Sequence, residues 1–334
     1  MQIVNGLPRP TRTVQRNGTA PRARNSAASP ADRCRVRGTS PYIVTRERIR
    51  IFADLTHNEH PIHRHETAAR DYGYPALVAP PTFATLAMLR AQDDAIRILA
   101  PGVRHSPLLH TRQTLDIRRL LVAGDIVTTD VQIRSVRTTS EYAMVEAHLV
   151  LTGHDGEIVQ SGSSFLHVCI PTAAAALSAA RLSAARETAA VPHAVPEVSV
   201  HRDPAPPGIP LPRRTFRLDR TELDSYAALG YPRSTPAARP NPGSGTGPPS
   251  GMMRLALTAG YLSSCLGDPA AVSRYEAEFT HFGGRPGRTV APVEISGRVI
   301  SVDRTGSAAV ELDGRCLERR LFIHAQAVLR PPAH

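Results

Sequence analysis

The feature that most limits the fold of this sequence is a helical segment with no polar face. Two prolines, Pro80 and Pro81, precede the nearly all-apolar run Thr82–Leu89. Proline suits the first turn of a helix, because the N–H that it lacks would have no partner there. A helix that is apolar on every side has to be buried on every side. We therefore expect this helix at the centre of its domain, enclosed by other elements.

Strand-like segments follow this helix along the chain. In residues 125–137 apolar and polar residues alternate, with Val127, Val131 and Ile133 on one face, as in a half-buried strand. The pair Asp155-Gly156 is a hairpin signal, so the sheet should be antiparallel. The predicted strands are Leu109–Leu121, Asp125–Arg137, Tyr142–Leu151 and Ile158–Ile170.

The last third of the chain repeats this order of elements. A short helix is predicted at Thr221–Ala228 and a second apolar helix at Ser250–Leu257. The strands expected after them are Arg274–Phe282, Val290–Val302, Ala308–Leu312 and Cys316–Leu329. We therefore expect two units of one architecture, with their sheets side by side.

The low-complexity segments predict where these units begin and end. Residues 1–40 are Arg-rich and have no apolar periodicity, so we expect a disordered extension. Residues 41–170 should form the first unit and residues 211–332 the second. Between them, residues 171–210 are Ala-rich and then Pro-rich, which is typical of a linker. In the second unit, residues 229–249 contain Pro, Gly, Ser and Arg but no His or Asp.

Charge and cysteine content narrow the partners and the compartment. The 334 residues carry a formal net charge of +11, but the basic N-terminal segment has no interleaved aromatic residues, so we expect no nucleic-acid partner. No run reaches the roughly 18 apolar residues of a membrane helix, and the N-terminus lacks the apolar core of a secretory signal. The four cysteines form no CxxC motif. This favours a reducing, cytoplasmic compartment and no metal cluster.

One stretch carries the candidate chemistry. The segment Phe52–His63 is rich in histidine, and Ala69 follows it after five residues. It resembles the active-site segment of the MaoC-like (R)-specific enoyl-CoA hydratases and (3R)-hydroxyacyl-ACP dehydratases. That segment reads aromatic, small, Gly-Asp-x-Asn-Pro-aliphatic-His, then five residues and a small one. The positions that match it are Pro61, Ile62, His63 and Ala69.

Three positions depart from the family pattern. His57 stands where the family has Gly, Asn58 where it has the catalytic Asp, and His60 where it has Asn. Asn58 keeps the shape and hydrogen-bonding capacity of Asp but carries no charge. The run Ala79–Phe83 resembles the accessory subunit of two-component (3R)-hydroxyacyl-ACP dehydratases. The chain therefore resembles a fusion of an accessory-type first half and a second half that lacks the hydratase motif.

The resemblance covers roughly 250 of the 334 residues and implies an α+β fold, the double hot dog. In that fold, two curved antiparallel sheets are each wrapped around a central helix. Such a chain can act as a monomeric double hot dog or as a homodimer. The implied substrate is an acyl thioester, in which coenzyme A or phosphopantetheine is part of the substrate and no separate cofactor is needed.

The resemblance also implies roles for four residues. His63 would be the base, and Asn58 would orient the water or the leaving hydroxyl. Because Pro81 has no N–H, the backbone N–H of Thr82 or of Gly251 would stabilise the enolate oxygen. Glu59 and Glu66 are the carboxylates that could compensate for the missing Asp. A metal site built from the four nearby histidines is the alternative, but their spacing matches no standard ligand set, so we expect no metal.

Two functions remain open from the sequence. The first is an acyl-thioester dehydratase or hydratase, a hydro-lyase acting on a CoA- or carrier-protein-bound 3-hydroxyacyl or enoyl chain in polyketide or fatty-acid metabolism, with acyl carrier protein as a partner. The second is a non-catalytic double-hot-dog protein that binds acyl groups or a partner. The substitution at Asn58 and the rewritten segment 229–249 favour the second function, whereas the retained His63 favours the first.

Overall fold

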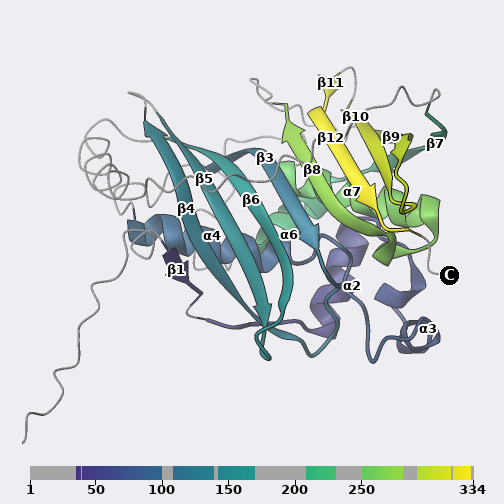
Figure 1. The fold of residues 1–334 in the computed structure, drawn as a ribbon, viewed down its shortest axis with the longest axis horizontal. Helices are drawn as coiled ribbons and strands as arrows, with labels where there is room; N and C mark the ends of the chain where they lie inside the picture. Colours follow the sequence, from purple (N-terminus) through teal and green to yellow (C-terminus); the bar gives the residue numbers. More distant parts are fainter. Residues whose placement is uncertain are drawn as a thin grey trace, which may run out of the picture.

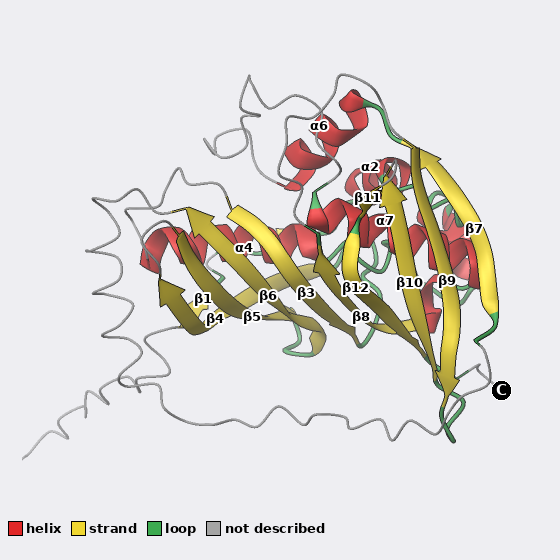
Figure 2. Cartoon of the chain, turned by 90° about the horizontal axis from the view of Figure 1, so that it is seen from above, coloured by secondary structure: helices red, strands yellow, loops and turns green. Residues whose placement is uncertain are grey.

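The computed structural model describes residues 35–38, 40–99, 108–138, 142–169, 208–230, 250–280, 292–316 and 319–331. Their strands form one antiparallel sheet of twelve strands, and the longer helices lie on one side of it (Figures 1 and 2). This is the architecture that the sequence predicts. No helix among these residues is both long enough and apolar enough to cross a membrane.

The first half supplies one end of the sheet and one long helix. Its helices are α2 (Arg46–Leu55), the 3-10 turn η1 (Pro61–His63), α3 (Glu66–Asp71) and the long α4 (Thr85–Leu99). Thr45 caps α2 by accepting a hydrogen bond from the Arg48 N–H at 3.3 Å. The strands are β1 (Arg35–Arg37), β2 (Tyr42–Ile43), β3 (Leu108–Ile117), β4 (Ile126–Thr138), β5 (Tyr142–Gly153) and β6 (Ile158–Cys169).

The second half repeats this plan. Its helices are α6 (Arg220–Gly230), the long α7 (Gly251–Leu266) and the 3-10 turn η4 (Pro269–Ala271). Ser250 caps α7 by accepting from the Met253 N–H at 3.3 Å. The strands are β7 (Pro210–Arg217), β8 (Val272–Phe279), β9 (Pro292–Val302), β10 (Ala308–Cys316), β11 (Arg319–Arg320) and β12 (Phe322–Leu329).

The strand order has an internal two-fold pattern. It runs β1-β4-β5-β6-β3-β8-β12-β10-β9-β7, so the sequence β4-β5-β6-β3 is mirrored by β9-β10-β12-β8. The two halves therefore meet where β3 and β8 pair, with Leu115 opposite Tyr275. At this junction Arg274 forms an ion pair with Asp116 at 2.8 Å. The two predicted sheets are in this way continuous with each other.

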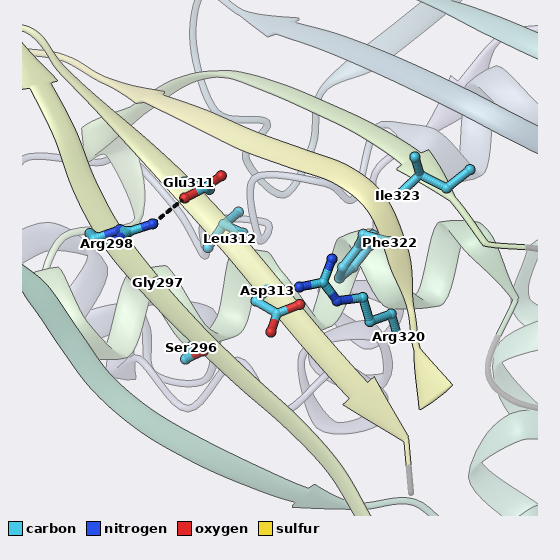
Figure 3. A pocket seen from close by; sticks show the side chains of 9 residues that line it. All are labelled: Ser296, Gly297, Arg298, Glu311, Leu312, Asp313, Arg320, Phe322 and Ile323. Atoms are coloured by element: carbon cyan, nitrogen blue, oxygen red, sulfur yellow. Dashed lines mark hydrogen bonds and ion pairs between the residues drawn. The ribbon is translucent and has the colours of Figure 1, made fainter. Parts of the chain in front are cut away.

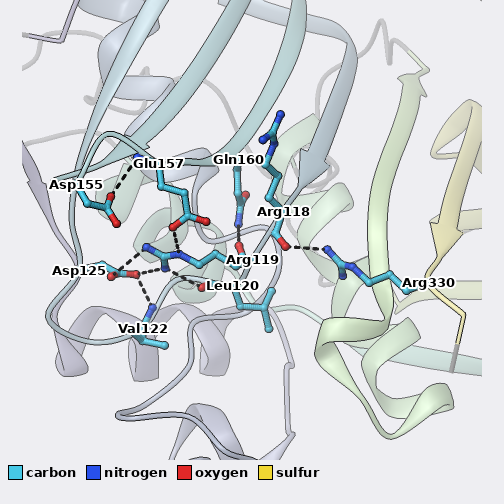
Figure 4. Close-up of polar contacts among 9 residues, drawn as sticks. All are labelled: Arg118, Arg119, Leu120, Val122, Asp125, Asp155, Glu157, Gln160 and Arg330. Atoms are coloured by element: carbon cyan, nitrogen blue, oxygen red, sulfur yellow. Dashed lines mark hydrogen bonds and ion pairs between the residues drawn. The ribbon is translucent and has the colours of Figure 1, made fainter. Parts of the chain in front are cut away.

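Arg330 also joins the two halves (Figure 4). Its guanidinium donates to the carbonyl oxygens of Ala270 and Val272 in the second half, and of Ile117 and Arg118 in the first. Beside it, Arg119 pairs with Asp125 at 2.8 Å, and this carboxylate also accepts from the Val122 N–H at 2.9 Å. These contacts fix the turn between β3 and β4. The halves are thus held together by backbone pairing and by charge-assisted hydrogen bonds.

Several element boundaries differ from the sequence prediction. The predicted disordered extension includes Arg35–Arg37, but these residues form β1, because Val36 packs against the core and the strand pairs with β4. The apolar helix begins at Thr85 and not at Thr82, because residues 81–84 form a turn first. The last strand was expected to start at Cys316, which instead ends β10. Residues 1–34 and 171–207, with most of the predicted linker, lie outside the described residues.

Candidate functional site

The histidine-rich loop between α2 and α3 holds two buried polar side chains. Asn58 and His63 both have zero solvent exposure, although polar residues in loops are usually solvated. The loop has little regular secondary structure, but backbone hydrogen bonds hold it in place. The Asn58 N–H donates to the Ala53 carbonyl at 2.9 Å, and the His63 N–H donates to the His60 carbonyl at 3.1 Å. Buried polar groups without full partners are expensive, so this loop is the first place to look for function.

His63 is held in one tautomer. Its Nδ1 lies 2.7 Å from the Val78 carbonyl oxygen, so Nδ1 carries the proton and donates it. Its Nε2 is buried and has no hydrogen-bond partner, which leaves a free lone pair. Burial lowers the pKa of His63 to about 4, although the bond to Val78 acts in the opposite direction. The imidazole is therefore neutral at pH 7 and able to accept a proton at Nε2.

This lowered pKa predicts a loss of stability in acid. The ordinary pKa is 6.5 and the folded value is about 4, so the unfolded chain binds more protons at His63 between these two pH values. Stability contributed by the neutral imidazole is therefore lost as the pH falls through this window, by about 2 kcal/mol between pH 7 and pH 5. Urea unfolding at both pH values should show this loss in the wild type and a smaller one in His63→Gln. Equal losses in the two proteins would contradict the assignment.

Asn58 is oriented by Thr56. Its Nδ2 donates to the Thr56 carbonyl oxygen at 3.2 Å and to Thr56 Oγ1 at 2.8 Å, while this hydroxyl donates to the Phe52 carbonyl at 2.6 Å. A flipped amide would place Oδ1 against the Thr56 carbonyl, so the orientation follows from the acceptor. Asn58 Oδ1 is buried and has no partner. The amide thus offers one free acceptor, which is the group that could orient a water or a hydroxyl.

Thr82 lies in the turn before α4, between Val78 and Phe83. Four residues upstream, Val78 is bonded to His63, and one residue downstream the ring of Phe83 lies 5.3 Å from that of Phe52 in α2. Thr82 is fully buried, and its Oγ1 has no hydrogen-bond partner. Among the described residues, no carbonyl oxygen accepts from its backbone N–H. The structure therefore places Thr82 between a residue that contacts the loop and one that contacts α2, and its backbone N–H is free among the described residues.

The structure does not bring Gly251 to the same place. Gly251 is the first residue of α7, where its Cα faces the ring of Phe279. The part of α7 that reaches the loop is Gly260, nine residues later and therefore about 14 Å along the helix axis. A Cβ built at Gly260 would lie 2.9 Å from the carbonyl oxygen of Thr56. The helix of the second half packs directly on the loop of the first.

The loop residues that depart from the family pattern also contact the second half. His57 has a positive φ of 51°, the left-handed conformation that few residues other than glycine adopt, histidine being one of those found there more often. Its ring lies 5.5 Å from that of Phe216, and its Nε2 lies 3.7 Å from a carboxylate oxygen of Glu222. Both contacts join the loop of the first half to elements of the second half. The rewritten position is therefore a contact between the halves.

Neither nearby carboxylate replaces the missing Asp. Glu59 is 62% exposed and pairs with Arg214 of β7 at 2.8 Å, and Glu66 pairs with Arg46. Within the described part of the chain, no group of three or more His, Cys, Asp or Glu side chains could hold a metal. The rings of His60 and His63 lie 6.1 Å apart, edge to face. The candidate site therefore contains an imidazole, an amide and a hydroxyl.

A separate pocket of about 330 Å³ lies on the outer face of the second-half sheet (Figure 3). Its rim carries Arg298 and Glu311, which form an ion pair at 2.9 Å, and Asp313 and Arg320. The pocket is lined by residues of β9, β10, β11 and β12, and none of the candidate residues lies in it. Its mixed charges partly satisfy one another, and we assign it no part in the chemistry.

Sequence reasoning missed two residues that support the site. Thr56 orients Asn58, yet a threonine at a helix end gives no signal beyond that of an ordinary cap. Gly260 lets α7 approach the loop, and here a signal existed. An isolated glycine inside an apolar helical pattern costs stability, so it usually has a packing or functional reason.

This chain is similar to known proteins at two levels, a family model and a sequence relative. Residues 34–161 match the family model described as FAS1-like, dehydratase domain region. A UPF0336 protein of Saccharopolyspora erythraea is 33% identical over 128 residues, which is 38% of this chain and 82% of that protein.

Solved structures extend the likeness to both halves. A MaoC-like dehydratase is 26% identical with a TM-score of 0.67, over 89% of this chain and 98% of that one. A Mycobacterium tuberculosis protein described as having a double hotdog fold is 12% identical with a TM-score of 0.61, over 89% and 95% of the two chains. The second likeness concerns the fold alone. The predicted double hot-dog fold is thereby confirmed.

Proposed function

The chain belongs to the MaoC-like dehydratase family, and from this premise we propose that it is an acyl-thioester dehydratase or hydratase whose site is the first-half loop. The observation that carries the proposal is the state of His63. This imidazole is buried and neutral, its Nδ1–H is held by the Val78 carbonyl, and its Nε2 lone pair has no partner. A side chain fixed in this way is prepared to take a proton.

The proposed dehydration uses one base for two proton transfers. His63 Nε2 takes the α-proton of a 3-hydroxyacyl thioester, while negative charge develops on the thioester oxygen. The electron pair forms the Cα–Cβ double bond, the Cβ–O bond breaks, and the imidazolium returns its proton to the leaving hydroxyl, which departs as water. Hydration is the same path in reverse. A low-dielectric site strengthens each of these interactions, because little water screens them.

Two further residues support these steps in the proposal. The free N–H of Thr82 suits an enolate oxygen, because a hydrogen bond to an oxyanion is roughly twice as strong as one between neutral groups. The free Oδ1 of Asn58 suits the β-hydroxyl or the attacking water, to which it can only act as an acceptor. Gly251 is left without a role, because α7 carries it away from the loop. Orientation by these fixed groups replaces the charge that an Asp would have supplied.

The carrier and the chain of the substrate remain part of the proposal. Coenzyme A or the phosphopantetheine of an acyl carrier protein would deliver the acyl group, in polyketide or fatty-acid metabolism. The positive charge that remains outside the Arg-rich first forty residues supports an anionic carrier, since opposite charge speeds encounter. A panel of crotonyl and 3-hydroxyacyl thioesters, on coenzyme A and on carrier protein, tests the proposal. We expect a change in enoyl-thioester absorbance with at least one of them.

The same panel decides between the two candidate functions. His63 has no solvent exposure, which is the specific observation that favours a non-catalytic acyl-binding or partner protein. If no thioester is turned over but some bind in calorimetry, the binding function replaces the proposed one. Turnover that depends on His63 would exclude the binding function as the only role.

Restoring the family's Asp should cost stability. In Asn58→Asp, the carboxylate could no longer donate to Thr56, and one of its oxygens would face the Thr56 carbonyl. We expect a loss of about 1–3 kcal/mol at pH 7, the usual cost of leaving a buried polar group without its partner. This loss should shrink at low pH, where the carboxyl is protonated and can donate again. Urea unfolding at pH 7 and pH 4.5 measures both effects, and an unchanged stability at pH 7 would contradict the orientation of Asn58.

A further inference from the structure

His60 occupies a position where the family pattern has Asn, and its side chain connects three parts of the site. Its Nε2 lies 3.1 Å from the Gly267 carbonyl oxygen in the second half. Its Nδ1 lies 3.5 Å from the Ile62 N–H, at the start of the turn that contains His63. One neutral tautomer satisfies both contacts, with the proton on Nε2. The ring also packs edge-on against Tyr72, with 5.1 Å between ring centroids.

The partner of His60 in the second half is rigidly placed. Gly267 is the C-cap of α7 and adopts the left-handed conformation with φ of 68°, and its N–H donates to the Ser263 carbonyl at 2.9 Å. The last carbonyl groups of a helix have no partner within the helix and carry partial negative charge. A donor placed there is therefore favoured. The His60 N–H is such a donor, and it links the loop to the end of α7.

This link fixes the short turn on which His63 lies. The carbonyl of His60 accepts from the His63 N–H at 3.1 Å, so the two residues bracket η1. The Ile62 carbonyl accepts from the Val78 N–H at 3.1 Å, next to the Val78 carbonyl that binds His63 Nδ1. A shift of His60 would move the turn relative to residue 78. The bond that defines the tautomer of His63 would then lengthen.

We propose that His60 is a positioning residue, through which the second half holds His63 in the tautomer with a free Nε2. The second half, which lacks the hydratase motif, thus affects the site through its contact with His60 and supplies no reacting group itself. The effect on turnover rests on the proposed function, whereas the effect on the tautomer does not. The tautomer of His63 can therefore be measured without any substrate.

Nitrogen-15 NMR of the histidine rings at pH 7 is the first test. In the wild type, His63 should show one neutral form protonated at Nδ1. In His60→Ala, we expect a mixture of the two neutral forms, because the turn is no longer anchored. Where a substrate is known, kcat should fall about 10-fold to 100-fold with KM little changed, since misplacement of a reacting group by about 1 Å has effects of this size.

Two conservative variants separate the two contacts of His60. In His60→Gln, the side-chain amide can reach the Gly267 carbonyl as Nε2 does. In His60→Asn, the shorter side chain can accept from the Ile62 N–H as Nδ1 does. We expect His60→Gln to restore the single Nδ1–H form of His63 and most of kcat, and His60→Asn to restore neither fully. Both variants replace the imidazole with an amide, so they can be measured in place of His60→Ala if that variant does not fold.

Glu59→Gln is the matched control. Glu59 also contacts the second half, through its ion pair with Arg214, but its side chain is 62% exposed. It should leave the His63 spectrum unchanged. A folded His60→Ala protein with a single Nδ1–H form of His63 and wild-type kcat would overturn the inference. Absence of turnover on every thioester, together with a changed His63 spectrum in His60→Ala, would remove the proposed function and leave this inference intact.

Discussion

Replacing His63 with alanine is expected to lower kcat/KM by about 10²-fold to 10⁴-fold on any thioester that the wild type turns over, the usual contribution of a general base. The physical reason is that Nε2 of this imidazole is the free basic nitrogen to which the proposal assigns the α-proton, and Ala removes it. The loss should appear mainly in kcat. Steady-state kinetics with the best substrate of the panel would measure it.

The control for this change is His65→Ala. His65 lies two residues away and is exposed, so it shares the sequence context but not the burial. It should retain wild-type kcat/KM. His63→Gln adds a second comparison, because an amide can still donate to the Val78 carbonyl but cannot act as a base. If His63→Gln and His63→Ala both keep wild-type activity while both proteins fold, His63 has no part in the mechanism.

The fold could be predicted because its signals are local and repeated. The apolar run Thr82–Leu89, which leads into α4, and the apolar run of α7 had no polar face, and such segments can only lie inside. Strand alternation and the turn at Gly156, with φ of 86°, fixed the order of strands along the chain. Repetition of the plan predicted two sheets side by side, and the structure joins them by pairing β3 with β8. What the sequence could not supply were boundaries such as Arg35–Arg37, which form a strand only because β4 is beside them.

The site was predicted less completely, because much of it is made by contacts between distant segments. The resemblance identified His63 and Asn58, and the structure finds both buried, but their chemical state depends on the Val78 carbonyl and on Thr56. No sequence pattern indicates which backbone carbonyl will face an imidazole. From the sequence alone, His57 and His60 were departures from the active-site pattern that suggested a loss of function. In the structure they contact Phe216 and Gly267, which lie more than 150 residues away in sequence.

Gly260 should be the second residue at which a small change has a large effect. Gly260→Ala places a methyl group 2.9 Å from the Thr56 carbonyl oxygen, 3.0 Å from that of His57 and 3.1 Å from Asn58 Nδ2. All three atoms belong to the loop, and two are backbone oxygens that cannot rotate away. We expect a loss of about 1–3 kcal/mol from overpacking, although Gly to Ala inside a helix normally gains about 1 kcal/mol. Urea unfolding measures this balance.

The same change should also reduce activity, because the loop has to move away from α7. A displacement of Asn58 and His63 by about 1 Å can cost roughly 10²-fold in rate. Gly260→Ala would then lower kcat/KM without altering any group that contacts substrate. An increase in stability with unchanged activity would show that the loop does not depend on this close approach.

Gly230→Ala is the matched control for the helix contribution. Gly230 ends α6, and among the described residues a Cβ there would meet only Leu86 and Leu89 at 3.9 Å, an ordinary contact distance. It should therefore be neutral or slightly stabilising. If Gly260→Ala loses stability and Gly230→Ala does not, the loss is caused by the contact between α7 and the loop. The second half would then hold the site in place by shape, through a helix that carries none of the family's acids or bases.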